Sequence, residues 1–153
     1  RMQFYLEFPP VTLVNSSPAF AAPNGEYVCR GEPFTMAFGA TDADGDQLRY
    51  ALVTPYQDLT LSGGTRTFVP VQWQGGFDEQ NQIPGSPSLR IDPATGVLTV
   101  TATNLGLHVF SVEAEEFRNG RLIGRVRRDF QLLVVDCPNL PPPTPQVFAN
   151  GAL

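Results

Sequence analysis

Three aspartates at alternate positions form the clearest candidate for binding chemistry. Asp42, Asp44 and Asp46 surround a glycine-containing bend, and calcium prefers six to eight hard oxygen ligands of this kind. The EF-hand pattern does not fit, because Gln47 stands where that loop needs glycine and Val53 where it needs glutamate. Two interpretations stay open: a calcium site completed by backbone carbonyls or water, and a solvated turn that uses aspartate for its turn geometry.

Three aromatic side chains of the long segment 54–88, which connects two predicted strands, are candidates for ligand binding. Trp73 is the one tryptophan, and together with Tyr56 and Phe77 it would offer flat apolar faces on which a sugar can stack. The alternative is that these aromatic rings plug the segment onto the core. Residues 69–73 are predicted to form a short strand that folds back over the sheet.

Groups suited to catalysis are scarce. All ten basic residues are arginines, so lysine-dependent phosphate binding, Schiff-base and Ser-Lys schemes are excluded. His108 is the single histidine, and with Cys29 and Cys137 it falls short of the four ligands of a structural zinc site. We therefore expect His108 to be a packed residue and the protein to have no enzymatic activity.

Charge argues against two classes of partner. The net charge of −5 disfavours nucleic acid, which attracts proteins through a basic surface. Apolar runs are too short to span a bilayer, so membrane insertion is not expected. Four arginines close in sequence would suit an anion site or, alternatively, a cross-strand ladder with neighbouring glutamates; they are Arg121, Arg125, Arg127 and Arg128.

The elements that would position these residues are strands. Apolar residues alternate with polar ones along 2–8, 34–38, 48–52, 97–102, 107–117 and 122–135, and acidic glycine-containing turns stand at 42–46 and 92–96. Asn119-Gly120 predicts a type I′ hairpin, because both residues accept the positive φ that this turn requires. A two-residue loop would place Glu113 opposite Val126, and Glu116 diagonal to Arg121 and Arg125.

With 153 residues, the chain has the length of one ordinary domain. Seven or eight strands, no helical pattern and one long connection predict an all-β fold, an antiparallel β-sandwich with Greek-key connections. Strand 2–8 is followed by Pro9-Pro10 and could pair with the edge of a neighbouring module. Segment 138–145 is rich in proline and is predicted to form a polyproline II spacer.

Several motifs between Asn15 and Cys137 resemble the PKD-like and cadherin-like modules of large Bacteroidota surface proteins, such as gliding-motility-associated adhesins exported by type IX secretion. They include Asn15-Ser16-Ser17-Pro18, Glu32-Pro33-Phe34, Val71-Gln72-Trp73, the runs GATDADGDQLRYAL (39–52) and IDPATGVLT (91–99), the stretches 115–120 and 127–130, and Val135-Asp136-Cys137. The resemblance implies an extracellular immunoglobulin-like sandwich, arrayed with its neighbours and without catalytic activity. Calcium is often linked with such an acidic run in cadherin-like modules, whereas in PKD-like modules it is commonly a plain turn.

In an exported module of this kind, the even cysteine count favours a disulfide between Cys29 and Cys137, the alternative being two buried thiols. We expect three parts: a strand segment at 1–14, the sandwich at 15–137 and a proline-rich linker at 138–153. The predicted function is a structural or adhesive module of a long cell-surface protein, stiffened by calcium if the acidic turn binds it. Its partners would be neighbouring modules and surface polysaccharide. The alternatives are a subunit that assembles by strand exchange and a carbohydrate-binding module.

Overall fold

The computed structural model describes residues 4–10, 12–21, 27–62 and 65–138 of the chain, and within these ranges it contains strands, turns and no helix. The all-β class is therefore confirmed. The strands are β1 (Phe4–Glu7), β2 (Ala19–Phe20), β3 (Tyr27–Cys29), β4 (Pro33–Ala37), β5 (Ala40–Thr41), β6 (Gln47–Val53), β7 (Tyr56–Ser62), β8 (Thr65–Pro70), β9 (Arg90–Ile91), β10 (Val97–Thr101), β11 (Gly106–Arg118) and β12 (Arg121–Val135).

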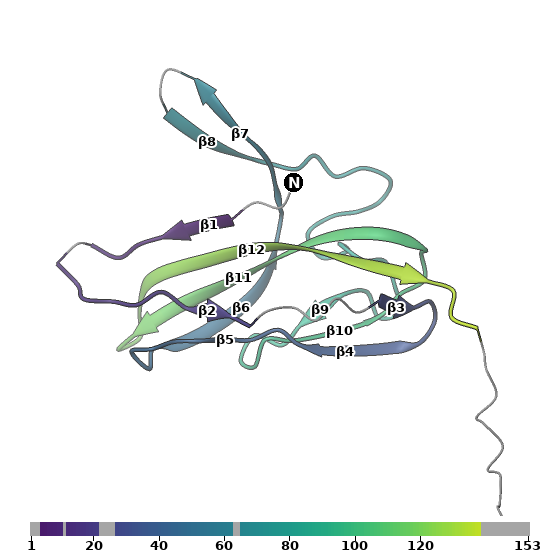
Figure 1. Cartoon of the computed structure of the whole chain (residues 1–153), viewed down its shortest axis with the longest axis horizontal. Coiled ribbons are helices and arrows are strands. Elements are labelled where there is room, and N and C mark those ends of the chain that lie inside the picture. Colours follow the sequence, from purple (N-terminus) through teal and green to yellow (C-terminus); the bar gives the residue numbers. More distant parts are fainter. Residues whose placement is uncertain (1–3, 11, 22–26, 63–64, 139–153) are drawn as a thin grey trace, which may run out of the picture.

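Two sheets pack against each other as the layers of a sandwich (Figure 1). The main sheet has the order β1-β12-β11-β6, and β3 adds to it by pairing in parallel with the end of β12. The second sheet has the order β4-β10-β9, and the short pair β2-β5 lies beside it. Apart from β3, the pairings in both sheets are antiparallel, as alternating strand patterns predict.

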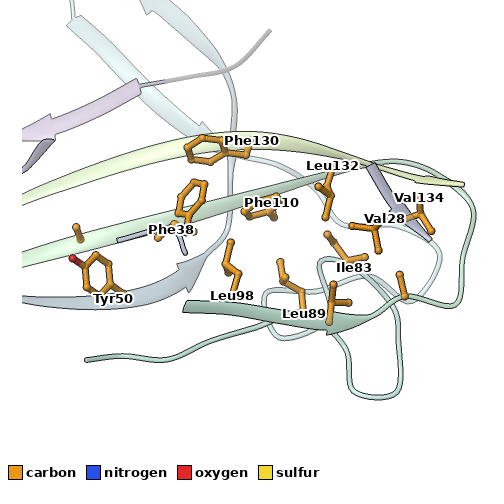
Figure 2. Packing of buried hydrophobic residues seen from close by; sticks show 14 residues of the cluster. Val28, Phe38, Tyr50, Ile83, Leu89, Leu98, Phe110, Phe130, Leu132 and Val134 are labelled. Carbon is orange, nitrogen blue, oxygen red and sulfur yellow. The ribbon is translucent and has the colours of Figure 1, made fainter. Parts of the chain in front are cut away.

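The core lies between the two sheets and is built by every second residue of the long strands. Phe110 on β11 and Phe130 on β12 face inward and meet Phe38, whose ring centroid lies 4.0 Å from that of Phe130 in an edge-on arrangement (Figure 2). Ile83, which belongs to the long segment 54–88, and Leu89, which directly follows that segment, are also buried. Each such side chain contributes about 1.5–3 kcal/mol by its removal from water. The end of the long segment is thus anchored in the core.

The Asn119-Gly120 hairpin forms as predicted, with Arg118 opposite Arg121 and both loop residues at positive φ. The predicted register holds only at the tip. Beyond Phe117 the pairing shifts by one residue, because Ile123 has no partner on β11 and forms a β-bulge. Glu113 therefore lies opposite Arg127, and the predicted pairing of Glu113 with Val126 is wrong.

The predicted strand at 69–73 is also wrong. A hairpin of β7 and β8 takes its place, and β8 already ends at Pro70. The hairpin projects away from the two layers in Figure 1. The sequence did carry a signal for this hairpin: residues alternate on either side of Gly63-Gly64, and two glycines suit a hairpin loop. The two glycines themselves lie outside the described ranges.

Strand β1 pairs with β12 of its own chain, from Phe4 opposite Arg128 to Glu7 opposite Arg125. The edge of β12 between these positions is therefore covered by the chain itself. The predicted strand 2–8 is shorter in the structure, since β1 ends at Glu7, while Met2 and Gln3 lie outside the described residues. Of the predicted linker 138–153, only Pro138 is described.

Candidate functional site

The acidic turn connects β5 to β6 and is organised by its own first residue. One Asp42 carboxylate oxygen, Oδ1, accepts hydrogen bonds from the backbone N–H groups of Asp44 (3.0 Å) and Asp46 (2.9 Å). This is the side-chain-to-backbone pattern that makes aspartate common in turns. One carboxylate oxygen from each of the three aspartates lies within 4.8 Å of the others. The turn thus gathers three carboxylates, as the spacing predicted.

Arg118 reaches into this turn from the end of β11. Its Nε donates to Asp46 Oδ1 at 2.7 Å while its Nη2 donates to the second oxygen, giving a two-point ion pair. The same guanidinium lies 3.7 Å from Asp44 and donates to Asn15 Oδ1 at 2.7 Å. The hydrogen bond from Arg118 is the main reason that the pKa of Asp46 is lowered. A cation is therefore already in place beside the carboxylates.

Glu116 lies behind the turn and is almost fully buried, with 1% of its surface exposed. Its Oε1 accepts a hydrogen bond of 2.7 Å from Asn15 Nδ2. Burial, together with the hydrogen bond to Asp46 and the negative charge of Asp42, raises the pKa of Glu116 to about 7. Glu116 therefore keeps its proton below neutral pH, beside the ionised Asp46. The predicted pairing of Glu116 with Arg121 and Arg125 is wrong, because Glu116 pairs with Gly124, and the bulge at Ile123 turns Arg125 to the opposite face, where it pairs with Glu115.

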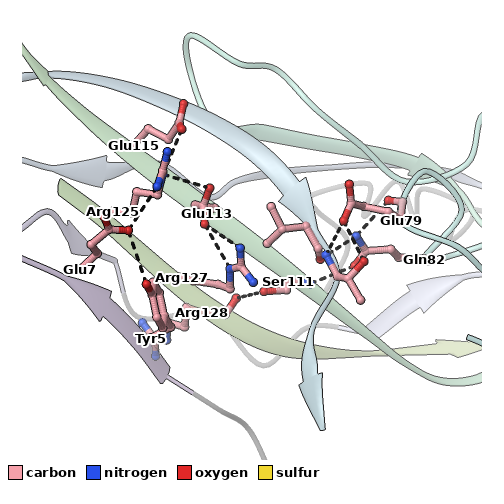
Figure 3. A network of polar contacts seen from close by, with 12 residues as sticks. Tyr5, Glu7, Glu79, Gln82, Ser111, Glu113, Glu115, Arg125, Arg127 and Arg128 are labelled. Carbon is pink, nitrogen blue, oxygen red and sulfur yellow. Dashed lines mark hydrogen bonds and ion pairs between the residues drawn. The ribbon is translucent and has the colours of Figure 1, made fainter. Parts of the chain in front are cut away.

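Two glutamates of β11 and two arginines of β12 form a ladder on the outer face of the main sheet, the face turned away from the second sheet. Arg127 donates to Glu113 at 2.8 Å, and Arg125 contacts both Glu115 and Glu7 at 3.2 Å (Figure 3). Of the other two arginines in the predicted cluster, Arg121 lies at the tip of the hairpin opposite Arg118, and Arg128 points to the core side and lies over the Phe130 ring. This division favours the ladder over a common anion site.

Tyr56, Trp73 and Phe77 line one hollow of about 610 Å³ on the outer face of the main sheet. The sequence could not show that they converge. Its floor is formed by β11 and β12, where Val109 pairs with Gln131. The aromatic rings also brace the structure: Trp73 Nε1 contacts Thr54 Oγ1 at 3.4 Å, and the Phe77 ring centroid lies 6.0 Å from that of His108.

The hollow and the sheet next to it expose aliphatic side chains to water. Leu105 is 47% exposed, Leu107 59% and Val109 40%. Leu107 pairs with Leu133, which is 45% exposed and pairs in turn with Tyr27 on β3. Isolated exposed leucines are ordinary, but a contiguous apolar patch on a protein surface indicates a contact site. We call these residues, together with the hollow, the apolar face.

Gln82 holds the wall of the hollow to the sheet, and sequence reasoning missed it. Its side chain is buried, accepts from the Ser111 N–H at 3.0 Å and donates to the carbonyls of Val53 (3.1 Å) and Glu79 (3.0 Å) (Figure 3). Glu79 in turn accepts from the N–H and the hydroxyl of Thr54, both at 2.8 Å. A glutamine in a polar loop gives no sequence signal for such a role. The segment is nevertheless fixed in place before any ligand binds.

His108 is packed, as expected. It is 7% exposed and borders the hollow, and its Nε2 lies 3.0 Å from the Asn104 carbonyl oxygen.

Cys29 and Cys137 form a disulfide, with their Cα atoms 5.3 Å apart. The parallel pairing of β3 with β12 brings the two residues to the same end of the sheet, with Cys29 opposite Val135. Arg30 lies beside the disulfide and forms an ion pair of 2.8 Å with Asp136. The pairing agrees with the sequence-based expectation.

No family model, curated protein or solved structure matches the chain. The case for a function therefore rests on the disulfide, the acidic turn and the apolar face. Within the described residues, no helix is long and apolar enough to cross a membrane.

Proposed function

We propose that the chain is a non-catalytic structural and adhesive module of a multi-domain extracellular protein, an immunoglobulin-like sandwich of the PKD-like or cadherin-like kind suggested by its sequence motifs. The observation that carries this proposal is the disulfide at the end of β3 and β12. Disulfides persist in oxidising compartments and are rare where thiols are kept reduced. Extracellular protein modules commonly combine such a bond with an all-β fold.

The position of the disulfide suits a module that bears tension. It joins residues 108 positions apart and stabilises the fold by about 4–5 kcal/mol through the entropy of the unfolded chain. Tension applied through the two ends of the chain would pass from Cys29 directly to Cys137. Once β1 has separated from β12, all the strands between these cysteines, from β4 to β12, would lie outside the path of the force.

The polar side chains of the main sheet support a structural role over a catalytic one. Glu113 and Glu115 are paired with Arg127 and Arg125, and Asp46 is paired with Arg118. His108 is buried beside the Asn104 carbonyl oxygen. A catalytic site needs a base or nucleophile that faces the substrate, whereas these groups face one another.

The acidic turn offers calcium a site only in competition with Arg118. The three carboxylate oxygens lie close enough together to share an ion, and calcium takes such oxygens readily. Arg118 competes for the same carboxylates. We therefore propose that calcium binds weakly at the acidic turn and adds little to the stability that Arg118 already provides.

A carbohydrate-binding function is the second candidate, because Tyr56, Trp73 and Phe77 line one hollow. Aromatic faces stack on the apolar faces of sugars. Saturable binding of a glycan that is lost in Trp73→Ala would favour this function.

The main proposal is tested on the protein isolated from the cells that produce it. Intact cells are treated with a protease that cannot enter them, and the isolated protein is alkylated without reductant and weighed. We expect the protein to be cleaved on intact cells and to take up no alkyl groups. Protection from the protease together with two alkylated cysteines would overturn the extracellular assignment.

A further inference from the structure

The apolar face combines features that suit an uncharged, extended ligand. Its floor exposes Leu105, Leu107 and Val109, and its wall carries the three aromatic rings. Besides the buried Gln82, four glutamines line it and supply amide groups, namely Gln57, Gln72, Gln74 and Gln131. Among the described residues that line the hollow, Asp129 carries the only carboxylate and none is an arginine. The charge of the hollow therefore favours neither an anionic nor a basic ligand strongly.

Exposed aliphatic side chains point to a peptide rather than a sugar. A polyproline II segment presents apolar rings on its sides and unpaired carbonyl oxygens along its backbone. Aromatic-lined grooves recognise such segments with low loss of entropy, because the ligand is already extended. Leu107 and Val109 can pack against proline rings, and the glutamine amides can donate to the carbonyls.

The chain itself contains a matching ligand. Segment 138–145 has the sequence PNLPPPTP, and no charged residue occurs in 138–153. We propose that the apolar face of one copy binds the proline-rich segment 138–145 of a second copy. This inference rests on the proposed function, in which neighbouring modules are the partners, and it names the surface and the segment through which they join.

The direction in which the chain leaves β12 favours binding of segment 138–145 to a second copy rather than to its own. β12 runs from Gln131, at the floor of the hollow, to Val135 and then to the disulfide at Cys137. Figure 1 shows that β12 points away from the body of the sheet where it ends. A return to the hollow would require a sharp reversal just before three consecutive prolines, and proline-rich segments are semi-rigid. Head-to-tail contact between copies avoids that reversal and extends into a chain of modules.

The test uses the full-length chain and a fluorescent synthetic peptide of residues 138–153. We expect saturable peptide binding by fluorescence anisotropy and self-association of the full chain between about 10 µM and about 1 mM by sedimentation, in the range of weak peptide-binding surfaces. Leu107→Ser with Val109→Ser should weaken both by at least about 10-fold, as should Trp73→Ala. Val14→Ser is the matched control, because Val14 is 89% exposed and does not line the hollow.

Three results would overturn the inference. The first is a peptide that does not bind, or binds equally well to the Leu107→Ser/Val109→Ser variant. The second is a full chain that stays monomeric at all these concentrations. The third is binding of a neutral oligosaccharide, dependent on Trp73, in place of the peptide.

Failure of this inference can be told apart from failure of the proposed function. If the protease and alkylation results stand while the peptide does not bind, the proposed function survives and only its binding surface is lost. Circular dichroism of each variant shows whether it is folded.

Discussion

Arg118 on β11 donates to both carboxylate oxygens of Asp46, a residue 72 positions earlier in the chain. The contact joins the end of the long hairpin to the acidic turn. It places a guanidinium beside the carboxylates that the sequence suggested as calcium ligands. The side chain of Asp46 is only 5% exposed, so this carboxylate depends on its partner.

Replacing Arg118 with glutamine should destabilise the fold, because the buried Asp46 loses its countercharge. We expect a lower midpoint of chemical denaturation in Arg118→Gln. Arg90→Gln is the control, since Arg90 is exposed on the short strand β9 and should leave the midpoint unchanged. Equal midpoints for Arg118→Gln and the native protein would show that the acidic turn does not need this cation.

Calcium should matter more once Arg118 is gone. In the native protein we expect millimolar calcium to move the melting temperature little relative to chelator, because the guanidinium holds two of the three carboxylates. In Arg118→Gln the shift should be larger, and it should disappear when Asp44→Asn is added. No shift in either protein would rule out a calcium site at the turn.

Glu116 should make the stability fall as the pH rises from about 4.5 to about 7. The pKa of this buried carboxyl is raised to about 7 from its ordinary value of 4.5, so in that window the folded protein keeps a proton that the unfolded chain loses. The loss is on the order of 2 kcal/mol. The lowered pKa of Asp46 acts in the opposite direction, since its contribution is lost as the pH falls below its ordinary range.

Denaturation curves between pH 4.5 and 8 measure this effect. Glu116→Gln keeps the shape of the side chain without the charge and should remove the fall over this window. The surface variant Glu115→Gln should retain it. A native protein whose stability rises steadily from pH 4.5 to pH 7 would contradict the assignment.

The sequence determined the strands well but not the charge network, and the reason is a single residue. Asn119-Gly120 correctly located the hairpin, yet Ile123 bulges and moves every pairing beyond Phe117 by one position. A shift by one turns the paired strand over, so Arg125 lies on the outer face opposite Glu115, whereas Glu116 shares the inner face of β11 with Ala114 and contacts Asn15. An isoleucine in a run of alternating residues carries no signal for a bulge.

The candidate sites show the same limit. Spacing along the chain was enough to bring Asp42, Asp44 and Asp46 together, because all three lie in one turn. The convergence of Trp73 and Tyr56 with β11 depends on contacts distant in sequence. Gln82, which provides them, has no distinguishing neighbours in the sequence.

Gln82→Ala should destabilise the fold by about 2–4 kcal/mol. The substitution removes the hydrogen bonds of the Gln82 side chain to the buried Ser111 N–H and to the Val53 and Glu79 carbonyls. The wall of the hollow should loosen, with a change in Trp73 fluorescence under native conditions. Gln80→Ala is the control, as the Gln80 side chain is exposed. A fully stable Gln82→Ala protein with native fluorescence would show that the wall is held by other contacts.

Mechanical unfolding of single molecules held by their two ends tests the structural role of the disulfide most directly. The 153-residue chain less the 108-residue separation of Cys29 and Cys137 leaves 45 residues free to extend. The oxidised protein should therefore reach a contour length of about 150–160 Å, and with reductant it should reach about 500–550 Å. An oxidised protein that extends to the full length would contradict the account, because the disulfide would then not shield the sandwich from tension.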